Sequence, residues 1–383
     1  MCKQLINKLV GRELADTNVM AVKSWIMHAQ VAEKFSISGN RIMLAGDSAH
    51  HFPPAGGFGM NTGIQDVHNL AWKIASVARG FASSEILRSY EIERKPIAIF
   101  NSLLSVNNFK AAMAVPAALG LDVRLANMVH DAVKDGIGSI MPTGMQKALL
   151  EGIFKIGRAQ LSENLLNEKN PVGSLRLAKL RRLFSEGQSL QLQFPAEDLG
   201  FRYTEGALVS ENGSSTAAST FSSSSRKRYV PSAEPGSRLP HMYVELLPNK
   251  DIVSTLDLVS YDELQFLLIM APTKASGDVA RAALTVAKDM KVPLKVCVIW
   301  PNEASYEANS VKLSLAPRKD FLDVAETTTS EESWWSLCQM SDEGAILVRP
   351  DGHVAWRVKD GFRHLDLVSE VRKVLSHILC FRI

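Results

Sequence analysis

The hydrophobic pattern in the first third of the chain predicts two consecutive helices. In the first, apolar residues recur at spacings of three and four, as along one face of a helix: Ile64, Val67, Ala71, Ile74 and Ala78. Gly80 follows, and glycine readily takes the left-handed conformation that ends a helix. A second helix is predicted to open at Ser83-Ser84-Glu85 and to continue through Ile97, with a kink at Pro96.

Upstream of these helices the pattern is less regular. Residues 1–45 are predicted to be irregular, with short strand-like pieces such as residues 19–27. The run from Arg41 to Ala45 is short and largely apolar, and it ends at Gly46, as a buried parallel strand would. A glycine-rich turn, extending from Gly46 to Gly63, then joins this strand to the first helix.

The middle of the chain is predicted to be mostly helical, with amphipathic helices at residues 146–161 and 175–184. Four basic residues lie on the latter helix: Arg176, Lys179, Arg181 and Arg182. We interpret them as a solvated face and not as a nucleic-acid patch, because no aromatic residues interleave with them. Residues 210–228 are rich in serine and end in a basic triplet, which indicates a flexible linker.

Beyond the linker, strands and helices alternate. Buried strands are predicted at residues 264–270 and 294–300, with a helix at 278–290 between them. Two further strands flank a turn-type sequence at residues 350–353, and an amphipathic helix at 365–379 closes the chain. This order of elements predicts a thioredoxin-like α/β unit.

Composition narrows the class of protein. Of 383 residues, 46% are hydrophobic and 22% are charged, as in a globular protein long enough for two or three domains. A net charge of +3 does not by itself favour a nucleic-acid or anionic-membrane partner. The four cysteines have no metal-type spacing, which favours a reduced intracellular protein, either cytoplasmic or organellar. No segment has the pattern of a signal peptide or a transmembrane span.

The glycine-rich turn between Gly46 and Gly63 is the stretch that carries chemistry. Asp47 would stand at the carboxyl end of a strand, where cofactors bind in open α/β folds, and its carboxylate can accept hydrogen bonds from ribityl hydroxyls. Pro54 follows another proline, and together they keep the backbone extended and free of N–H donors. The alternative for Asp47 is a cap or turn residue.

The second half of the turn exposes main chain. Three glycines let the backbone approach a planar ligand without an intervening Cβ: Gly56, Gly57 and Gly59. The helix starting near Met60 then points free N–H groups and its positive dipole end at an acceptor. For a flavin, that acceptor is the pyrimidine edge of the ring.

This stretch resembles the second FAD motif of the class A flavoprotein monooxygenases, which hydroxylate aromatic rings. The GD-x-AH start and the PP-x-GG-x-GMN-x-G core are both present between Gly46 and Gly63. The resemblance implies that Asp47 holds the ribityl chain and that Pro54 lies near the reactive edge of the isoalloxazine. It also implies that Gly57 and Gly59 face the ring and that the amides of Met60 and Asn61 face the pyrimidine oxygen.

The C-terminal sequence resembles the tail domain of the phenol and polyketide hydroxylase branch, including residues 235–241, 254–258 and 347–357. That domain is thioredoxin-like without a redox cysteine pair, and no CxxC follows residues 264–270 here either. The family's strand–GxGxxG–helix unit and its later DG motif are not found in this sequence. The implied fold is α/β: the C-terminal part of a PHBH-like FAD-binding fold with a helical segment, followed by a thioredoxin-like α/β domain.

The expected domains follow from this resemblance. They are a partial FAD-binding and substrate domain at 1–112, a helical segment at 113–204, a serine-rich linker at 205–237 and a thioredoxin-like domain at 238–383. The implied activity is FAD-dependent hydroxylation of a phenolic or polyketide-like ring through a flavin C4a-hydroperoxide, with NAD(P)H as reductant. The alternative is a non-catalytic relative that acts in interaction or regulation.

Several residues have a structural interpretation beside a functional one. The His50-His51 pair is interpreted as part of the flavin loop and not as a metal site, because no acidic partner is suitably spaced. Arg94 is expected to form a structural ion pair with Glu91 or Glu93, and no side chain is assigned a catalytic role. The sequence Arg-Pro-Asp-Gly at 349–352 is interpreted as a hairpin turn, and Trp334-Trp335 as packing.

The expected partners follow from the same reasoning. A small aromatic molecule is the expected substrate, with no nucleic acid, no metal and no membrane span. A homo-oligomer or a complementing N-terminal polypeptide is the expected protein partner.

Overall fold

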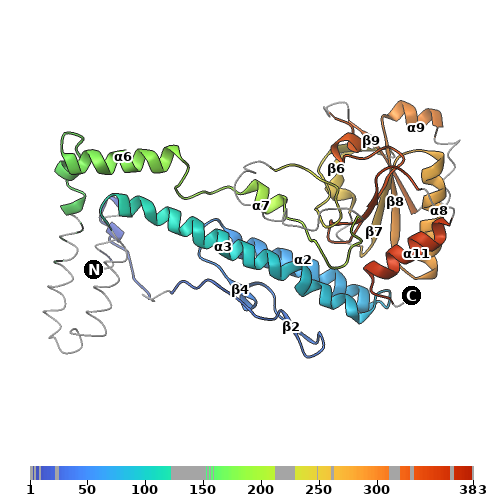
Figure 1. The fold of residues 1–383 in the computed structure, drawn as a ribbon, viewed down its shortest axis with the longest axis horizontal. Helices are drawn as coiled ribbons and strands as arrows, with labels where there is room; N and C mark the ends of the chain where they lie inside the picture. Colours follow the sequence, from blue (N-terminus) through green and yellow to red (C-terminus); the bar gives the residue numbers. More distant parts are fainter. Residues whose placement is uncertain are drawn as a thin grey trace.

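The computed structural model describes most of the chain in nine segments and a few isolated positions. The segments are residues 10–21, 26–121, 159–211, 229–247, 249–259, 263–309, 320–327, 332–362 and 366–381. Two long antiparallel helices, α2 and α3, run through the middle of the molecule, and the C-terminal sheet lies at one of their ends (Figure 1). The helix α6 lies beside the other end of α3 and contacts it (Figure 1).

The segment before α2 is built from two small antiparallel pairs. β1 (Gln30–Val31) pairs with β4 (His50–His51), and β2 (Ser36–Ile37) pairs with β3 (Ile42–Met43). The single 3-10 turn η1 (Gly46–Ser48) follows β3. The pairs are short, so this segment is held mainly by its contacts with α2 and α3.

The prediction of a buried parallel strand at residues 41–45 is therefore wrong. Only Ile42–Met43 form a strand, the strand is antiparallel, and Ile42 is 51% exposed. An apolar run is buried as a parallel strand only when neighbouring strands and covering helices are present on both sides. No such neighbours lie beside β3 in the described part of the chain. The strand-like piece at 19–27 is also not formed at its described positions, and residues 22–25 lie outside the described part.

The two predicted helices are confirmed. α2 spans Phe58–Ala78, and Gly80 follows with a φ of 78°, as expected of a left-handed stop. Ser83 accepts a hydrogen bond from the backbone N–H of Glu85 and so caps η2 (Ser84–Leu87), which leads directly into α3 (Arg88–Ala118). Pro96 lies inside α3.

The region after α3 contributes three short helical elements: η5 (Glu163–Leu166), α6 (Pro171–Ser185) and α7 (Pro195–Leu199). The helix predicted at 175–184 is confirmed, and the side chains of Arg181 and Arg182 are exposed, as expected of a solvated face. Most of the helix predicted at 146–161 and most of the linker predicted at 210–228 lie outside the described residues.

The C-terminal part is one seven-stranded sheet of order β11-β10-β7-β8-β9-β5-β6. β7 (Phe266–Met270) and β8 (Leu294–Trp300) are parallel, while β10 (Ala345–Val348) and β11 (Val354–Val358) form an antiparallel hairpin beside β7. The other members of this part are listed here with their bounds: β5 (Tyr243–Leu246), β6 (Ile252–Ser254), η6 (Thr255–Leu258), α8 (Lys274–Asp289), α9 (Glu303–Asn309), β9 (Phe321–Glu326), α10 (Trp334–Leu337) and α11 (Leu367–Ile378). The order β11-β10-β7-β8 is that of a thioredoxin-like unit, as predicted.

Side chains from α2 and from the connection between α2 and α3 enter the hydrophobic core of this sheet. Trp72, Phe81 and Ile86 belong to the same buried cluster as residues of β7, α8 and α11. The ring of Trp72 meets Phe266 edge-on, with centroids 6.0 Å apart. The backbone N–H of Ser83 also donates to the carbonyl of Leu379 at 3.0 Å. The α2–α3 hairpin and the sheet thus share one core.

The second face of the sheet buries two tryptophans and two cysteines. Trp334 and Trp335 are both buried in the core on the other face of the sheet, which confirms the packing interpretation. Two cysteines there, Cys297 and Cys338, are buried and free, and burial raises the pKa of both thiols. No helix within the described residues has the length and apolar content needed to cross a bilayer.

Candidate functional site

The predicted cofactor residues lie together on the surface of the bend between η1 and α2. Asp47, Pro54, Gly57 and Asn61 are exposed, and Met60 is 75% exposed. Gly59, the sixth residue, is half-buried, and a Cβ there would meet nothing within 4 Å among the described residues. Six other residues of the bend are buried: Ala49, His50, Pro53, Ala55, Phe58 and Thr62. The bend therefore turns main chain and small side chains outward.

Glycine is required at two places where the bend is tight. Gly56 has a φ of 112°, and a Cβ there would lie 2.4 Å from the ring of Phe58. Gly63 packs against Gly46, because a Cβ on Gly63 would lie 3.2 Å from the Cα of Gly46. These contacts fold the motif back on itself, so that its two ends touch.

The N-terminus of α2 presents free donors on this surface. Gly57 is the N-cap residue, in a left-handed conformation, and no side chain caps the helix. The side chain of Asn61 donates to the carbonyl of Gly57 at 3.1 Å, so its amide group does not occupy the first N–H groups of the helix. Free N–H groups at a helix N-terminus favour an electron-rich acceptor. The bend therefore fits the oxygen-bearing edge of a flavin.

A buried ion pair holds the bend from inside. The carboxylate of Asp66 accepts from the backbone N–H of Gly46 at 3.2 Å, lies 2.7 Å from Nε2 of His50 and accepts from Nε of Arg94 at 2.8 Å. All three side chains are fully buried. Burial would raise the pKa of Asp66, but the hydrogen bond with His50 and the charge of Arg94 outweigh burial and lower it. An ionised Asp66 thus joins both ends of the bend to α3.

Two interpretations made from the sequence change here. Arg94 forms an ion pair, as predicted, but its partner is Asp66 and not Glu91 or Glu93. His50 does have an acidic partner, because Asp66 lies one α2 turn beyond the bend and the bend folds back onto it. Within the described part of the chain no cluster of His, Cys, Asp or Glu could hold a metal ion.

A second buried network lies further along α2, where the sheet begins. Glu93 accepts from Nζ of Lys73 at 2.8 Å, from Asn69 at 2.6 Å and from Arg349 at 2.8 Å. Arg349 also donates through Nε to Asp351 at 2.9 Å. The four charged groups are buried, with two positive and two negative charges, so the network can be neutral as a whole.

The electrostatics of this network follow from burial and proximity. Burial lowers the pKa of Lys73 to about 8, against the opposing charge of Glu93. Burial would raise the pKa of Glu93, but the charges of Arg349 and Lys73 outweigh burial and lower it to about 2. The charge of Arg349 likewise holds the pKa of Asp351 well below its usual range, although burial opposes this.

The turn between β10 and β11 is therefore more than a connection, contrary to the interpretation from the sequence. Arg349 and Asp351 are within the turn, yet both are fully buried against α2 and α3. Residues after α7 complete the enclosure. Ala207 donates its backbone N–H to Glu93 at 2.8 Å, and a Cβ on Gly206 would lie 2.4 Å from the Glu93 carboxylate. Only tertiary contact reveals this role.

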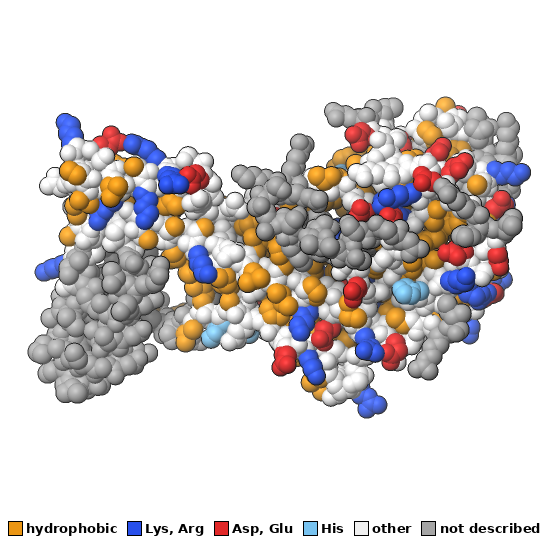
Figure 2. Space-filling view, in the orientation of Figure 1, with side chains coloured by type: hydrophobic (Ala, Val, Ile, Leu, Met, Phe, Trp, Pro, Cys, Tyr) orange, Lys and Arg blue, Asp and Glu red, His pale blue; other side chains and the backbone are white. Residues whose placement is uncertain are grey.

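The outer face of α2 is apolar and the inner face is polar. The apolar positions from which the helix was predicted are exposed: Ile64 is 60% exposed, Val67 57% and Ile74 47%. Met60 lies on the same face of the helix. Five polar residues of α2 are instead buried: Thr62, Asp66, Asn69, Lys73 and Ser76. We call the exposed row Met60, Ile64, Val67 and Ile74 the α2 apolar stripe. Hydrophobic side chains also gather over the middle of the face seen in Figure 2.

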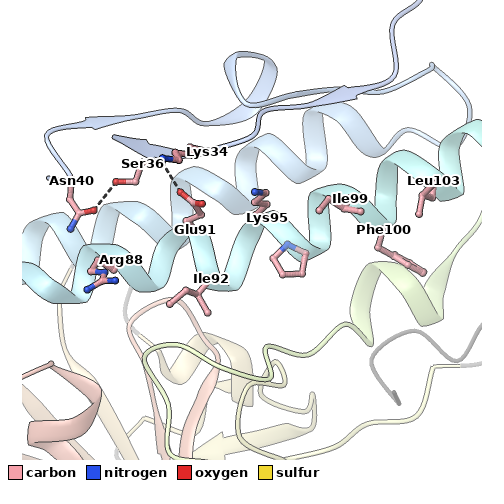
Figure 3. A pocket seen from close by; sticks show the side chains of 11 residues that line it. Lys34, Ser36, Asn40, Arg88, Glu91, Ile92, Lys95, Ile99, Phe100 and Leu103 are labelled. Carbon is pink, nitrogen blue, oxygen red and sulfur yellow. Dashed lines mark hydrogen bonds between the residues drawn. The ribbon is translucent and has the colours of Figure 1, made fainter. Parts of the chain in front are cut away.

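A groove of about 850 Å³ lies beside α3 and the β2–β3 hairpin (Figure 3). Its α3 wall is mixed, because apolar residues such as Ile92, Ile99 and Leu103 alternate with charged residues such as Lys95. Glu91 lies on this side of α3 and accepts from the backbone N–H of Ser36 at 2.9 Å. None of the six predicted cofactor residues lines this groove.

The comparisons with known proteins agree with this geometry. Residues 1–100 match the FAD binding domain family, and residues 232–379 match the family described as aromatic-ring hydroxylase, C-terminal. A Streptomyces coelicolor protein, named as a candidate polyketide hydroxylase, is 30% identical over 371 residues, covering 93% of this chain and 52% of that protein. The 2,4-dichlorophenol 6-monooxygenase of Cupriavidus pinatubonensis is 26% identical over 382 residues, covering 98% of this chain and 52% of that protein.

Solved structures show the same fold. The flavin-dependent monooxygenase PieE, in complex with FAD and substrate, superposes with a TM-score of 0.68 at 24% identity, covering 99% of this chain and 54% of PieE. The RebC-10x structure, described as native and K252c-bound, has a TM-score of 0.58 at 27% identity, covering 97% of this chain and 52% of RebC-10x. The family matches and the fold thus define a flavoprotein. The chain belongs to the FAD-dependent aromatic-ring monooxygenases, in the phenol and polyketide hydroxylase branch. It spans about half the length of the curated relatives it matches.

Proposed function

We propose that this chain provides the isoalloxazine-facing side of the FAD site in a monooxygenase that hydroxylates a phenolic or polyketide-like ring, with NAD(P)H as reductant. One observation carries the proposal: the bend exposes glycine main chain next to the uncapped N-terminus of α2. Bound FAD would supply the electron transfer and oxygen activation. The residues of this chain bind and orient the ring.

Each of the six site residues has a role in this proposal. Asp47 accepts hydrogen bonds from ribityl hydroxyls, since its exposed carboxylate lies at the start of the bend. Pro54, Gly57 and Gly59 lie against the ring, because Pro54 has no backbone N–H group and the two glycines have no Cβ. The amides of Met60 and Asn61 stabilise negative charge at the pyrimidine edge, aided by the dipole of α2.

The α2 apolar stripe supports a protein partner. An apolar row on a helix that buries its polar face is the reverse of what a solvent-facing helix shows. We propose that a complementing polypeptide with a strand–GxGxxG–helix unit packs against this stripe and binds the FAD pyrophosphate. The curated relatives are long enough to contain such a unit, since this chain covers only 51% and 52% of their length. Self-association through the stripe is the alternative.

The decisive experiment is to measure FAD binding, first by the chain alone and then with the N-terminal half of the Streptomyces coelicolor relative. Visible flavin absorbance after gel filtration reports retention of FAD. We expect retention in the mixture, followed by NAD(P)H oxidation that phenols stimulate and a hydroxylated product. A mixture that stays colourless with added FAD would contradict the proposal. That result would favour a non-catalytic interaction protein, which the exposed α2 apolar stripe also supports.

A further inference from the structure

Tyr203 lies between the two buried networks. Its hydroxyl is 3.2 Å from a terminal nitrogen of Arg94, which donates to it, and Arg94 belongs to the network under the bend. The guanidinium of Arg349, from the network at the sheet, lies 5.3 Å from the centroid of the Tyr203 ring. Both arginines are fully buried. Tyr203 is thus in direct contact with a charged group of each network.

These contacts form a path from the sheet through Tyr203 to the bend. At the sheet, the path begins at the β10–β11 turn. His353 packs against Tyr203 with ring centroids 4.7 Å apart. The backbone N–H of Tyr203 donates to the carbonyl of Gly236, and the N–H of Gly236 donates to Val354 of β11. The backbone of Tyr203 is therefore anchored to the C-terminal sheet, while its side chain contacts Arg94 and Ile97 of α3.

The other end of the path is the beginning of the bend. Arg94 holds Asp66, and Asp66 accepts the N–H of Gly46, the residue directly before Asp47. The same arginine donates to the carbonyl of Thr62 at the far end of the bend. A shift of Arg94 would therefore move both ends of the surface that carries the six site residues.

We propose that Tyr203 and Arg349 are positioning residues for the flavin-binding bend, so that the thioredoxin-like unit is part of the scaffold of the FAD site. The expected effect on FAD affinity rests on the proposed function. The coupling between the sheet and the bend does not. Buried networks of paired charges favour one arrangement, because an alternative that separates a pair leaves a charge without a partner. The thioredoxin-like unit then acts through side-chain contacts and needs no redox cysteines.

The coupling can be tested by hydrogen exchange in the chain without any cofactor. Tyr203→Phe removes one hydroxyl and keeps the ring against His353 and Arg349. We expect exchange of the Gly46 amide, followed in peptides covering residues 44–52, to accelerate about fivefold, the equivalent of one weakened hydrogen bond. Peptides covering residues 345–358 should keep their wild-type protection. Arg349→Lys, which keeps the charge and loses the forked contact, should accelerate both regions.

The matched control is Tyr243→Phe, since Tyr243 lies on β5 and is 56% exposed. It should change exchange in neither region. Unaltered protection at residues 44–52 in both Tyr203→Phe and Arg349→Lys would overturn the inference. So would an equal loss of protection over the whole chain, because that would indicate a general stabilising role.

Affinity for FAD gives a second and separate readout. With the complementing polypeptide present, the Kd for FAD should rise severalfold in Tyr203→Phe and remain unchanged in Tyr243→Phe. If wild type takes up no FAD, the proposed function fails, while the exchange experiment still decides the coupling. If exchange changes and the Kd does not, the bend is coupled to the sheet but the claim of flavin positioning is overturned.

Discussion

The ammonium group of Lys73 lies 2.8 Å from the carboxylate of Glu93, and both side chains are fully buried. The two residues come from neighbouring helices, and Glu93 is also the carboxylate that Arg349 of the sheet contacts. This arrangement makes Glu93 the common partner of α2, α3 and the β10–β11 turn. Removing Glu93 would leave two buried positive charges with too few partners.

We therefore expect Glu93→Ala to lower the free energy of unfolding by about 3–5 kcal/mol, the range for breaking a buried ion pair by removing one partner. Chemical denaturation monitored by circular dichroism measures the change. The control is Glu85→Ala, which removes an exposed pair with Arg88 and should cost about 0–1 kcal/mol. Equal effects of the two substitutions would contradict the role assigned to Glu93.

Because of the same carboxylate, we expect the folded chain to lose stability in acid. The pKa of Glu93 is about 2 in the folded chain, below the ordinary value of 4.5 in the unfolded chain. Between these values the unfolded state binds more protons, so stability is full above pH 4.5 and decreases as the pH falls towards 2. Asp66 and Asp351, whose pKa values are also lowered, add to this loss.

Denaturation midpoints measured between pH 2 and 6 test this dependence. Glu93→Gln should be less stable than wild type at pH 6, and the gap between the two should narrow as the medium is made more acidic. A constant difference across the range would show that the ionisation of Glu93 contributes nothing.

Asp47→Ala should weaken FAD binding in the complete complex by about 10–100-fold, the equivalent of hydrogen bonds to a charged acceptor. Fluorescence titration of FAD measures the Kd. Because Asp47 is exposed and lies outside both buried networks, the thermal midpoint without FAD should not change. Asp342→Ala, another exposed aspartate, provides the comparison. An unchanged Kd would remove Asp47 from the site.

The α2 apolar stripe predicts that Val67→Glu abolishes association with the complementing polypeptide while leaving this chain folded. Val67 is 57% exposed, so a carboxylate there is solvated in the free chain and buried only in the complex. Analytical ultracentrifugation of the mixture measures association. Leu175→Glu, on the exposed face of α6, is a matched control because Leu175 is 73% exposed. Association that survives in Val67→Glu would place the partner elsewhere.

Much of the fold could be predicted because local pattern and tertiary environment agree. The strand at Leu294–Trp300 and the helix closing at Gly80 are examples, since an uninterrupted apolar run and a glycine stop act within a few residues. The flavin bend could also be predicted, because its prolines and glycines restrict the backbone wherever they occur. Asp47, Pro54, Gly57, Met60 and Asn61 are all exposed on this bend, and their part in binding FAD stays a prediction.

What the sequence alone determined is the two long helices, the central strands and closing helix of the C-terminal unit, and the resemblance to the family, since these follow from spacing and backbone restriction. The tertiary structure decided which charges are paired. Asp66 bonds to His50 and Arg94, and Glu93 to Arg349, which lies 256 positions further along the chain. It also decided that α2 buries its polar face. A charged side chain is stable inside only beside a particular partner, and no local pattern records which distant segment brings that partner.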